Sequence, residues 1–280
     1  MTEKLKKKVD FAIKLLQSIP PDEPVEISYS GGKDSDVILE LAKMAGINYR
    51  AIYKNTTIDP PGTIAHCKEN GVEILNPQKK FLELVRENGV PSRSYRFCCK
   101  NLKEYKIANR NVQGVRRAES VKRAKRYHEP EVCRTYSKGE KVKIYLPILE
   151  WTNEDVAEFI AERGIKCHPL YYDEKGNFHV ERRLGCIGCP LKGDNGRADF
   201  LKYPKMLLLW IKNFQIYLDN HPSCGTTKKF AKSAHHVMFF RLFCKSYEEY
   251  QTLITGGLFP ETAIDAKSFM EEYFKIDLTI

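Results

Sequence analysis

The chain of 280 residues is 42% hydrophobic and 29% charged, which is ordinary for a globular protein and excludes a fibrous or wholly disordered chain. Its longest apolar run, residues 206–211, is far shorter than the ~20 residues of a membrane-spanning helix, so no membrane association is expected. Residues 1–10 are charged and lack the apolar stretch of a secretory signal. We therefore expect a cytoplasmic protein, whose nine cysteines stay reduced and serve a metal, a cluster, catalysis or packing.

The positive charge is concentrated in one segment. The chain has a net charge of +10, and residues 100–145 hold 14 Lys or Arg against 5 Glu and no Asp, a local net charge of +9. Such a segment attracts phosphates, either of a nucleotide or of a nucleic acid. A solvated helix face followed by a loop is the alternative interpretation.

Strand and helix patterns alternate along the first two thirds of the chain. Strands are predicted at 24–29, 49–55, 72–75, 110–115 and 142–148. Helices are predicted at 4–18, 35–45, after Pro60-Pro61, at 78–88, 117–127 and 152–162. This order indicates a doubly wound α/β fold with a mostly parallel sheet. The polar segment 128–141 is expected to be a mobile loop.

Beyond about residue 190 only helical patterns are found. They cover residues 203–219, 229–244, 246–255 and 262–275. We therefore expect two domains: a nucleotide-binding α/β domain over 1–192, which holds the cysteine motifs, and a helical carboxy-terminal extension over 193–280.

A glycine-rich turn directly follows the first predicted strand. It reads Ser30-Gly31-Gly32-Lys33-Asp34-Ser35 and leads into a helix. Glycines let the backbone approach an oxyanion, and a helix N-terminus offers N–H groups and a positive dipole end. Lys33 adds a charge, the two serines add hydroxyl donors, and Asp34 would help to hold Mg²⁺ on a polyphosphate. The spacing matches neither the Walker pattern nor the dinucleotide fingerprint.

The loop resembles the pyrophosphate loop of the ATP pyrophosphatase superfamily, also called adenine nucleotide α-hydrolase-like. Members of that superfamily adenylate a substrate and release pyrophosphate. The related sulfonucleotide reductases usually carry a degraded loop, whereas this loop is intact. The resemblance therefore implies that the ligand is ATP with Mg²⁺ rather than a sulfonucleotide. It also implies that Lys33 and Asp34 are catalytic residues.

Four cysteines form two close pairs, Cys98-Cys99 and Cys186-Ile187-Gly188-Cys189. Thiolates in such numbers suit Zn²⁺ or iron–sulfur. Adjacent cysteines are awkward for one tetrahedral ion, because neighbouring side chains diverge, whereas a [4Fe-4S] cube offers four separated corners. The residues favour a cluster, with Zn²⁺, a redox-active disulfide at 186/189 and two buried structural pairs as alternatives.

The cysteine order resembles the cluster signature of assimilatory adenosine phosphosulfate reductases, and further segments resemble the phosphoadenosine phosphosulfate reductase-like family. The match runs from about residue 24 to 192. The segments are Gly114-Val115-Arg116-Arg117-Ala118-Glu119-Ser120, Leu146-Pro147-Ile148 with Trp151-Thr152-Asn153-Glu154-Asp155-Val156, His168-Pro169-Leu170-Tyr171 and Arg183-Leu184-Gly185-Cys186. The resemblance implies nucleotide binding and a cluster at the four cysteines.

One departure from the reductases concerns their nucleophilic cysteine, which lies near the carboxyl end inside Glu-Cys-Gly-Leu/Ile-His. This chain ends without that motif, and its nearest approach is Ser223-Cys224-Gly225-Thr226. Sulfonucleotide reduction therefore has no evident nucleophile other than Cys224. Cys133, in the basic loop, is a weaker candidate for a persulfide carrier.

Arg116 and Arg117 follow a strand at the carboxyl edge of the predicted sheet, where such folds bind ligands. We expect at least one of them to bind a phosphate and Arg116 to act in catalysis. The alternative is a surface ion pair with Glu119. Asn55-Thr56 would contact ribose or adenine or form a simple turn. Arg182-Arg183 would tune the cluster or contact a phosphate.

These observations predict an iron–sulfur enzyme that activates an acceptor by adenylation for sulfur transfer, with the 100–145 segment pointing to a nucleic-acid acceptor. A cysteine desulfurase or a thioredoxin-type protein would be the donor partner. The first alternative is a sulfonucleotide reductase that releases sulfite. The second is a non-catalytic nucleotide- or nucleic-acid-binding module with a structural metal.

Overall fold

The computed structural model describes residues 1–106, 108–135 and 141–280. The chain divides into two compact units. Unit 1 consists of Met1–Asn55, Asp59–Pro77 and Leu102–Gly185, and unit 2 consists of Thr56–Ile58, Gln78–Asn101 and Cys186–Ile280. The chain thus passes from unit 1 into unit 2 and back before its carboxy-terminal helices. This division differs from the expected one, which has a single boundary at residue 192.

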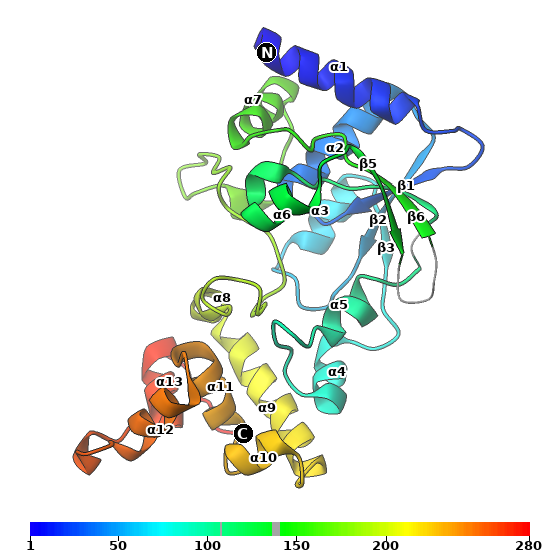
Figure 1. Ribbon diagram of the computed structural model, residues 1–280. Coiled ribbons are helices and arrows are strands. Elements are labelled where there is room, and N and C mark those ends of the chain that lie inside the picture. Colours follow the sequence, from blue (N-terminus) through cyan, green and yellow to red (C-terminus); the bar gives the residue numbers. More distant parts are fainter. Residues whose placement is uncertain (107, 136–140) are drawn as a thin grey trace. The chain divides into compact units, whose positions relative to one another are not determined.

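Unit 1 is built on a sheet whose six described strands have the order β3-β2-β1-β4-β6-β5 (Figure 1). The neighbouring strands are parallel, except for the antiparallel pair of β5 and β6. The strands are β1 (Val25–Tyr29), β2 (Tyr49–Lys54), β3 (Glu73–Leu75), β4 (Arg110–Val112), β5 (Glu131–Thr135) and β6 (Lys141–Tyr145). With the helices that flank this sheet, the arrangement confirms the predicted α/β class.

The core of unit 1 joins the sheet to its helices. Helix α2 (Lys33–Ala45) packs on β1 and contacts both α1 (Glu3–Gln17) and α7 (Asn153–Arg163), and α3 (Thr63–Glu69) contacts β3. Apolar residues at helical spacing on α1 and α2 and at alternate positions of β1 are buried together, among them Leu5, Leu16, Val25, Ile27, Val37 and Ile38. Burial of each such side chain stabilises the unit by roughly 1.5–3 kcal/mol. The core therefore fixes the β1–α2 turn, which carries the glycine-rich motif.

Two expectations about the basic segment were wrong. Residues 131–135, expected in a mobile loop, form β5, because Glu131 to Thr135 pair antiparallel with β6. The rest of that expected loop includes residues 136–140, which lie outside the described residues. The helix expected at 117–127 is broken at Ser120 into η1 (Arg117–Glu119) and α6 (Val121–Arg126), since extended Ser120 caps α6.

Unit 2 is helical in the part that the structure describes. It contains α4 (Phe81–Asn88), α5 (Phe97–Leu102) up to Asn101, α8 (Arg197–Lys202), α9 (Pro204–Asn220), α10 (Gly225–Lys229), α11 (Ala234–Phe243), α12 (Tyr247–Thr255), η3 (Pro260–Thr262) and α13 (Ala266–Phe274). Helix α9 packs on α4, α8 and α11, which explains why residues 78–101 belong to this unit. Its core is aromatic: Phe81 and Phe200 both lie against Trp210.

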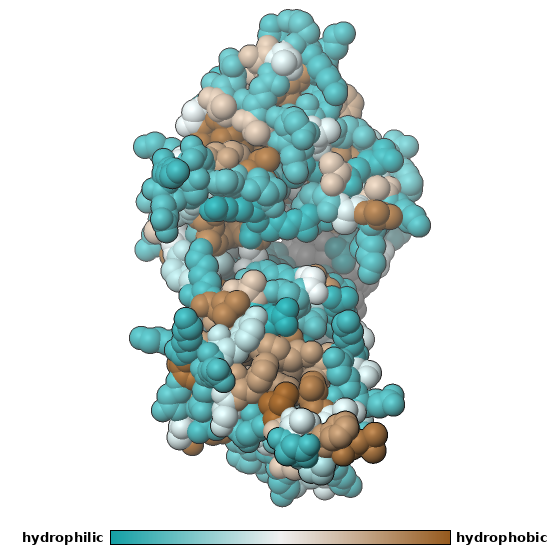
Figure 2. Space-filling model, turned by 90° about the vertical axis from the view of Figure 1, so that its left-hand side faces the viewer, coloured by the Kyte–Doolittle hydropathy of each residue, from teal (hydrophilic) through white to brown (hydrophobic). Residues whose placement is uncertain are grey.

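The surface of unit 2 carries apolar side chains among hydrophilic ones. Figure 2 shows brown, hydrophobic surface within the helical unit, while teal dominates the surface of unit 1. Leu258 and Phe259, in the turn after α12, are 92% and 62% exposed. In the described residues, none of the helices combines the length and the hydropathy needed to cross a bilayer.

Candidate nucleotide site and cysteine group

The glycine-rich turn joins the carboxyl end of β1 to the first turn of α2. Gly31 has a φ of +76°, a left-handed conformation that favours glycine, and Gly32 is the residue that caps the helix. The Ser35 hydroxyl donates to the Gly32 carbonyl at 2.6 Å, and the Ser30 hydroxyl lies 3.3 Å from that of Ser35. The turn is therefore closed by its own serines, with a helix N-terminus behind it, which is the geometry of an oxyanion cradle.

Lys33 and Asp34 are adjacent and paired in this cradle. Lys33 is only 3% exposed, and its Nζ lies 3.2 Å from Oδ2 of Asp34. Burial lowers the pKa of Lys33, although the attraction of Asp34 opposes this shift. A desolvated ammonium interacts strongly with any anion that reaches it, because little water competes.

Arg116 reaches the same carboxylate from the segment after β4. Its Nε donates to Oδ1 of Asp34 at 2.7 Å, while its Nη2 donates to Asn153 at 3.0 Å. The side chain is almost fully buried, with 1% of the residue exposed. Asp34 thus stands between two buried cations, Lys33 on one oxygen and Arg116 on the other, and holds both close to the cradle.

Arg117 points elsewhere. Its Nη1 lies 2.9 Å from Oε1 of Glu150, and its side chain is 39% exposed. Glu119, which the sequence suggested as an ion-pair partner, accepts instead from the Arg116 backbone N–H at 3.1 Å and pairs with Arg123. The structure therefore brings Arg116, and not Arg117, to the Lys33–Asp34 pair.

A buried polar group below the cradle was missed by the sequence analysis. Asp36 accepts from the Tyr29 hydroxyl and lies 2.9 Å from Nε2 of His66, and all three residues are buried. Nearby, Thr63 Oγ1 is 3.3 Å from Nε2 of the buried His168. The available signal was a second acidic residue among apolar positions of α2, but its histidine partner is 30 residues away in the chain.

The other candidate residues of unit 1 make hydrogen bonds within the protein. Asn55 Nδ2 donates to Asn76 at 2.9 Å, within a turn. Arg182 donates to the Tyr172 carbonyl at 2.7 Å, and Arg183 to the Glu119 carbonyl at 2.8 Å. These guanidinium groups thus bind backbone oxygens near η1 and the 169–172 turn.

The four candidate metal ligands all belong to unit 2. Cys98 and Cys99 lie in the first turn of α5, and Cys186 and Cys189 flank a tight turn in which the Cys189 N–H donates to the Cys186 carbonyl at 3.3 Å. A hydrogen bond to Cys99 raises the pKa of the Cys98 thiol, with burial and the nearby thiols Cys99 and Cys186 as further causes. The two pairs of cysteines are thus within electrostatic reach of each other.

Arg241 of α11 faces the same cysteines and was also missed. Its Nη2 donates to the Gly188 carbonyl at 2.6 Å, inside the Cys186–Cys189 turn, and its guanidinium lies 4.8 Å from the centre of the Trp210 ring. Burial lowers the pKa of Arg241 to about 10, while Cys189 and Cys98 attract its charge. A buried cation at this place would stabilise thiolates, which are the ligand form of cysteine.

The glycine between the second pair of cysteines is required by packing. Gly188 has a φ of +72°, and a Cβ there would stand 2.4 Å from Cζ of the buried Phe200. The Cys-Ile-Gly-Cys turn is therefore pressed against the aromatic core of unit 2.

The donor types suit a [4Fe-4S] cluster or Zn²⁺, since the four thiols belong to one unit and a buried arginine lies beside the Cys186–Cys189 turn. Within residues 1–106, 108–135 and 141–280, no group of three or more His, Cys, Asp or Glu is already arranged to hold a metal ion.

The remaining cysteines differ in exposure, and Cys244, at the end of α11, is half-buried. Cys67 and Cys167 are buried in unit 1, and burial raises the pKa of Cys67 to about 12. Cys133 is exposed on β5. Cys224 caps α10: burial alone would raise its pKa, but hydrogen bonds with the hydroxyl and N–H of Thr227 outweigh this effect and lower it.

The fold is that of an α/β protein with a glycine-rich turn at the carboxyl edge of a mostly parallel sheet. Residues 24–192 match the phosphoadenosine phosphosulfate reductase domain, and the chain belongs to that family. This result confirms the family to which the sequence motifs pointed.

Two curated relatives illustrate the range of the family. The chain is 30% identical over 219 residues to an uncharacterized protein of Methanocaldococcus jannaschii, an alignment that covers 71% of this chain and 43% of that protein. It is also 30% identical over 271 residues to sulfate adenylyltransferase subunit 2 of Shewanella halifaxensis, covering 83% of this chain and 85% of the relative. The chain spans about half the length of the M. jannaschii relatives that it matches, 43% of one and 52% of another.

One solved structure with a similar fold is the phosphoadenylyl-sulfate reductase of Candida auris in a phosphate complex. It is 15% identical, has a TM-score of 0.43, and the match covers 64% of this chain and 97% of that one. Another is the U34-tRNA thiolase NcsA of Methanococcus maripaludis with its [4Fe-4S] cluster, at 15% identity and a TM-score of 0.42, covering 79% of each chain.

Proposed function

We propose that the protein cleaves ATP between its α- and β-phosphates, adenylates an oxygen atom of an acceptor and prepares that position for sulfur transfer. The observation that carries this proposal is the intact Ser30–Ser35 turn, with Lys33 and Arg116 held against it by Asp34. Family membership supports nucleotide binding at this place.

The residues of unit 1 have separate roles in this reaction. The N–H groups of the turn and the hydroxyls of Ser30 and Ser35 bind the pyrophosphate part of ATP. Lys33 and Arg116 stabilise the charge that develops as pyrophosphate leaves. Asp34 keeps the two cations in place and is the carboxylate that would hold Mg²⁺, which usually binds through one or two carboxylates and the phosphates of its substrate. Arg117 lies next in the chain and would contact a phosphate only after leaving Glu150.

The reaction balances in two steps. An acceptor oxygen attacks the α-phosphorus, the bond from that phosphorus to the bridging oxygen breaks, and pyrophosphate leaves with the electron pair. A sulfur nucleophile then attacks the activated carbon or phosphorus and displaces AMP together with the acceptor oxygen. Sulfide would supply this sulfur directly. With a persulfide made by a cysteine desulfurase, the outer sulfur would attack, and a thioredoxin-type dithiol would then reduce the S–S bond between donor and acceptor and be oxidised to a disulfide.

Cys98, Cys99, Cys186 and Cys189 would hold a [4Fe-4S] cluster, with Arg241 beside them. With all four thiolates bound, each iron of the cluster would already have a protein ligand, so sulfide could bind to an iron only where one of the four cysteines gives up its place. The reduced thiols that the cluster needs are those of the cytoplasm, which is where we place the protein. Zn²⁺ at the same cysteines would instead make them a structural element of a binding module.

We further propose that the acceptor is a nucleic acid. The support is the +9 net charge of residues 100–145, most of which belong to unit 1, and the solvent-exposed Lys122, Lys125 and Arg126 of α6. This helix buries none of its residues, so its basic side chains are available to phosphates.

The proposal is tested with ATP that carries a radioactive label either at the α- or at the γ-phosphate. Labelled AMP and labelled pyrophosphate are the expected products in the presence of total RNA or single-stranded DNA. Lys33→Ala should abolish both, whereas Lys43→Ala, on the same helix but half exposed, should abolish neither. Formation of ADP and phosphate, or no nucleotide cleavage, would contradict the proposal.

A second candidate is sulfonucleotide reduction. The observation that favours it is the hydrogen-bonded Cys224 thiol, whose lowered pKa suits a nucleophile. It predicts sulfite release from adenosine phosphosulfate or its 3′-phosphorylated form with a thioredoxin-type reductant. Loss of that activity in Cys224→Ser would favour this candidate over adenylation.

A further inference from the structure

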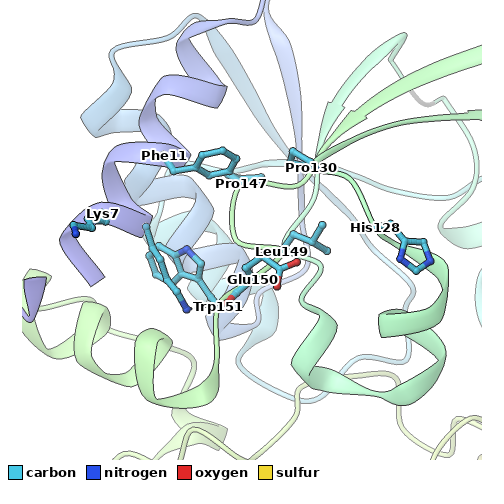
Figure 3. A pocket seen from close by; sticks show the side chains of 9 residues that line it. Lys7, Phe11, His128, Pro130, Pro147, Leu149, Glu150 and Trp151 are labelled. Atoms are coloured by element: carbon cyan, nitrogen blue, oxygen red, sulfur yellow. Dashed lines mark hydrogen bonds between the residues drawn. The ribbon is translucent and has the colours of Figure 1, made fainter. Parts of the chain in front are cut away.

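Unit 1 contains a hollow near the residues that follow β6. It measures about 310 Å³ and lies between α1 and the chain segments 128–130 and 147–151 (Figure 3). Its walls are mostly apolar and come from Phe11, Pro130, Pro147, Leu149 and Trp151. Figure 3 shows the flat rings of Phe11 and Trp151 on the same side of the hollow, with the two prolines beside Phe11.

Phe11 is unusual among the apolar residues of α1. The buried face of this helix is formed by others, such as Leu5, Val9 and Leu16, whereas Phe11 is 52% exposed. A single exposed apolar side chain is common on protein surfaces, but this ring also lines an apolar hollow, which makes it available for contact with a ligand.

Two basic side chains flank the hollow, and the carboxylate of Glu150, which is paired with Arg117, also lines it. Lys7, exposed on α1, lies on one side and His128 on the other (Figure 3). His128 is anchored to the end of α6, because its Nε2 lies 2.9 Å from the Lys125 carbonyl. Lys8 is already engaged by Asp155 at 2.5 Å. The hollow thus opens between a lysine-rich helix and the most basic segment of the chain.

Flat apolar walls with cations at the rim suit one ligand chemistry: an aromatic ring with phosphates on either side. We propose that this hollow receives one unstacked base of a single-stranded nucleic acid, whose neighbouring phosphates lie against Lys7 and α6. The inference deepens the proposed function and depends on its acceptor being a nucleic acid. Stacking of a base on an aromatic side chain contributes roughly 1–3 kcal/mol per base, and phosphate contacts add the salt-dependent part.

The hollow shares a wall with the arginines of the nucleotide site. The Arg117 N–H donates to the Leu149 carbonyl at 2.9 Å, its guanidinium binds Glu150, and Arg116 Nη1 donates to the Trp151 carbonyl at 3.4 Å. Residues 149–151 therefore lie between the hollow and the two arginines, and because Leu149 and Trp151 are only 3% and 2% exposed, Phe11 is the ring on which a base would stack. Binding a base here would place an acceptor strand next to the residues that bind ATP.

The test is binding of fluorescein-labelled oligonucleotides of about 12 nucleotides, within the usual site size, measured by anisotropy on the full chain. RNA and DNA strands are compared with a strand of the same length that lacks bases and with a duplex. Phe11→Ala should weaken binding of the single strands about tenfold and leave binding of the base-free strand unchanged. Phe259→Ala, at a 62% exposed position of unit 2, is the matched control and should change neither.

The cations are tested in the same assay. Lys7→Ala should lower the slope of log Kd against log salt by about one, whereas Lys4→Ala, on the same helix but not at the hollow, should lower it less. A strand that contains 4-thiouridine should crosslink to a peptide that includes Phe11. Three results would overturn the inference. Phe11→Ala and Phe259→Ala could weaken binding of the single strands equally, or Phe11→Ala could weaken binding of the base-free strand as much as that of the normal strand. The duplex could also bind more tightly than the single strands.

The same experiments separate this inference from the proposed reaction. If ATP is cleaved to AMP and pyrophosphate but no oligonucleotide depends on Phe11, the base site is wrong and the nucleotide site stands. If binding depends on Phe11 but ATP is not cleaved, the base site stands and the adenylation proposal fails.

Discussion

Nε of Arg116 donates to Oδ1 of Asp34 at 2.7 Å and thereby ties the segment after β4 to the turn after β1. These two strands are neighbours in the sheet, although 82 residues separate the two side chains. The contact assembles the candidate ATP site from two distant segments and leaves Lys33 on the other oxygen of the same carboxylate.

Arg116→Ala should destabilise the protein strongly, because the buried Arg116 guanidinium binds Asp34, Asn153 and the Trp151 carbonyl together, and all three would lose their donor. Removing one partner of a buried pair typically costs about 3–5 kcal/mol. Arg117→Ala, which removes an exposed pair with Glu150, should cost less than about 1 kcal/mol. Urea denaturation of the two variants measures both costs, and equal midpoints for the two would be inconsistent with the roles assigned to them.

Lys33→Met should weaken ATP binding at least about tenfold, since hydrogen bonds to charged groups contribute about 1.5–3 kcal/mol. The same change should not lower stability at neutral pH. Burial lowers the pKa of Lys33 in the folded state. Below that pKa the lysine is charged, and its buried charge destabilises the folded state. This cost fades as the pH rises toward 10.5, the pKa of the lysine in the unfolded chain.

The measurement is the free energy of unfolding of wild type and Lys33→Met between neutral and alkaline pH. The variant should be at least as stable as wild type at pH ~7, with the advantage shrinking as the pH approaches that of a free lysine. A variant that is less stable at neutral pH would show that Lys33 is a structural residue.

Gly188→Ala should disrupt unit 2, because the new Cβ would stand 2.4 Å from Phe200 at a φ of +72°. Overpacking of this kind costs about 1–3 kcal/mol, to which the backbone strain adds. Gly176→Ala is the control: its φ is +83°, but nothing lies within 4 Å of the added Cβ. The melting temperature and the iron content should fall much further in Gly188→Ala than in Gly176→Ala. Equal decreases in the two variants would refute the packing argument.

Serine replacements at Cys98, Cys99, Cys186 and Cys189 should each lower the iron and acid-labile sulfide of anaerobically purified protein. The wild type should hold about four of each per chain, as a cube requires. Cys244→Ser is the control, because this thiol is a half-buried residue at the end of α11. Stoichiometric zinc without sulfide in the wild type would rule out the cluster.

Cys224 should react with iodoacetamide much faster than Cys244 at pH ~7.5. Hydrogen bonds with Thr227 lower the pKa of Cys224, whereas burial raises that of Cys244 to about 11, so Cys224 has the larger thiolate fraction. Mass spectrometry of tryptic peptides after brief alkylation measures the ratio. Similar rates for the two thiols would remove the structural argument for Cys224 as a nucleophile.

Local patterns explain what could be predicted from the sequence. The Ser30–Ser35 turn was recognised because all its residues are contiguous and follow a buried strand, and the parallel sheet followed from the alternation of strands and helices. Asp36 and His66 were missed because their contact joins residues on two different helices. Arg241 was read as part of an apolar helix, and only packing places it at the Cys186–Cys189 turn.

Strand β5, at the edge of the sheet, could not be predicted from the sequence for a different reason. Strand β5 has no fully buried residue, and Val132 is its only residue that packs in a described apolar cluster. Its sequence therefore lacks the apolar alternation by which strands are recognised, and its place is set by pairing with β6. The choice between Arg116 and Arg117 was likewise settled by the position of Asp34 rather than by the motif.

Anaerobic calorimetry of the cluster-loaded protein tests the central claim most directly, with Mg·ATP, adenosine phosphosulfate and its 3′-phosphorylated form as ligands and Lys33→Ala as the control. We expect a clear preference for Mg·ATP that is lost in the variant. Preference for either sulfonucleotide, or an ATP affinity that Lys33→Ala leaves unchanged, would contradict the assignment of the Ser30–Ser35 turn as an ATP site.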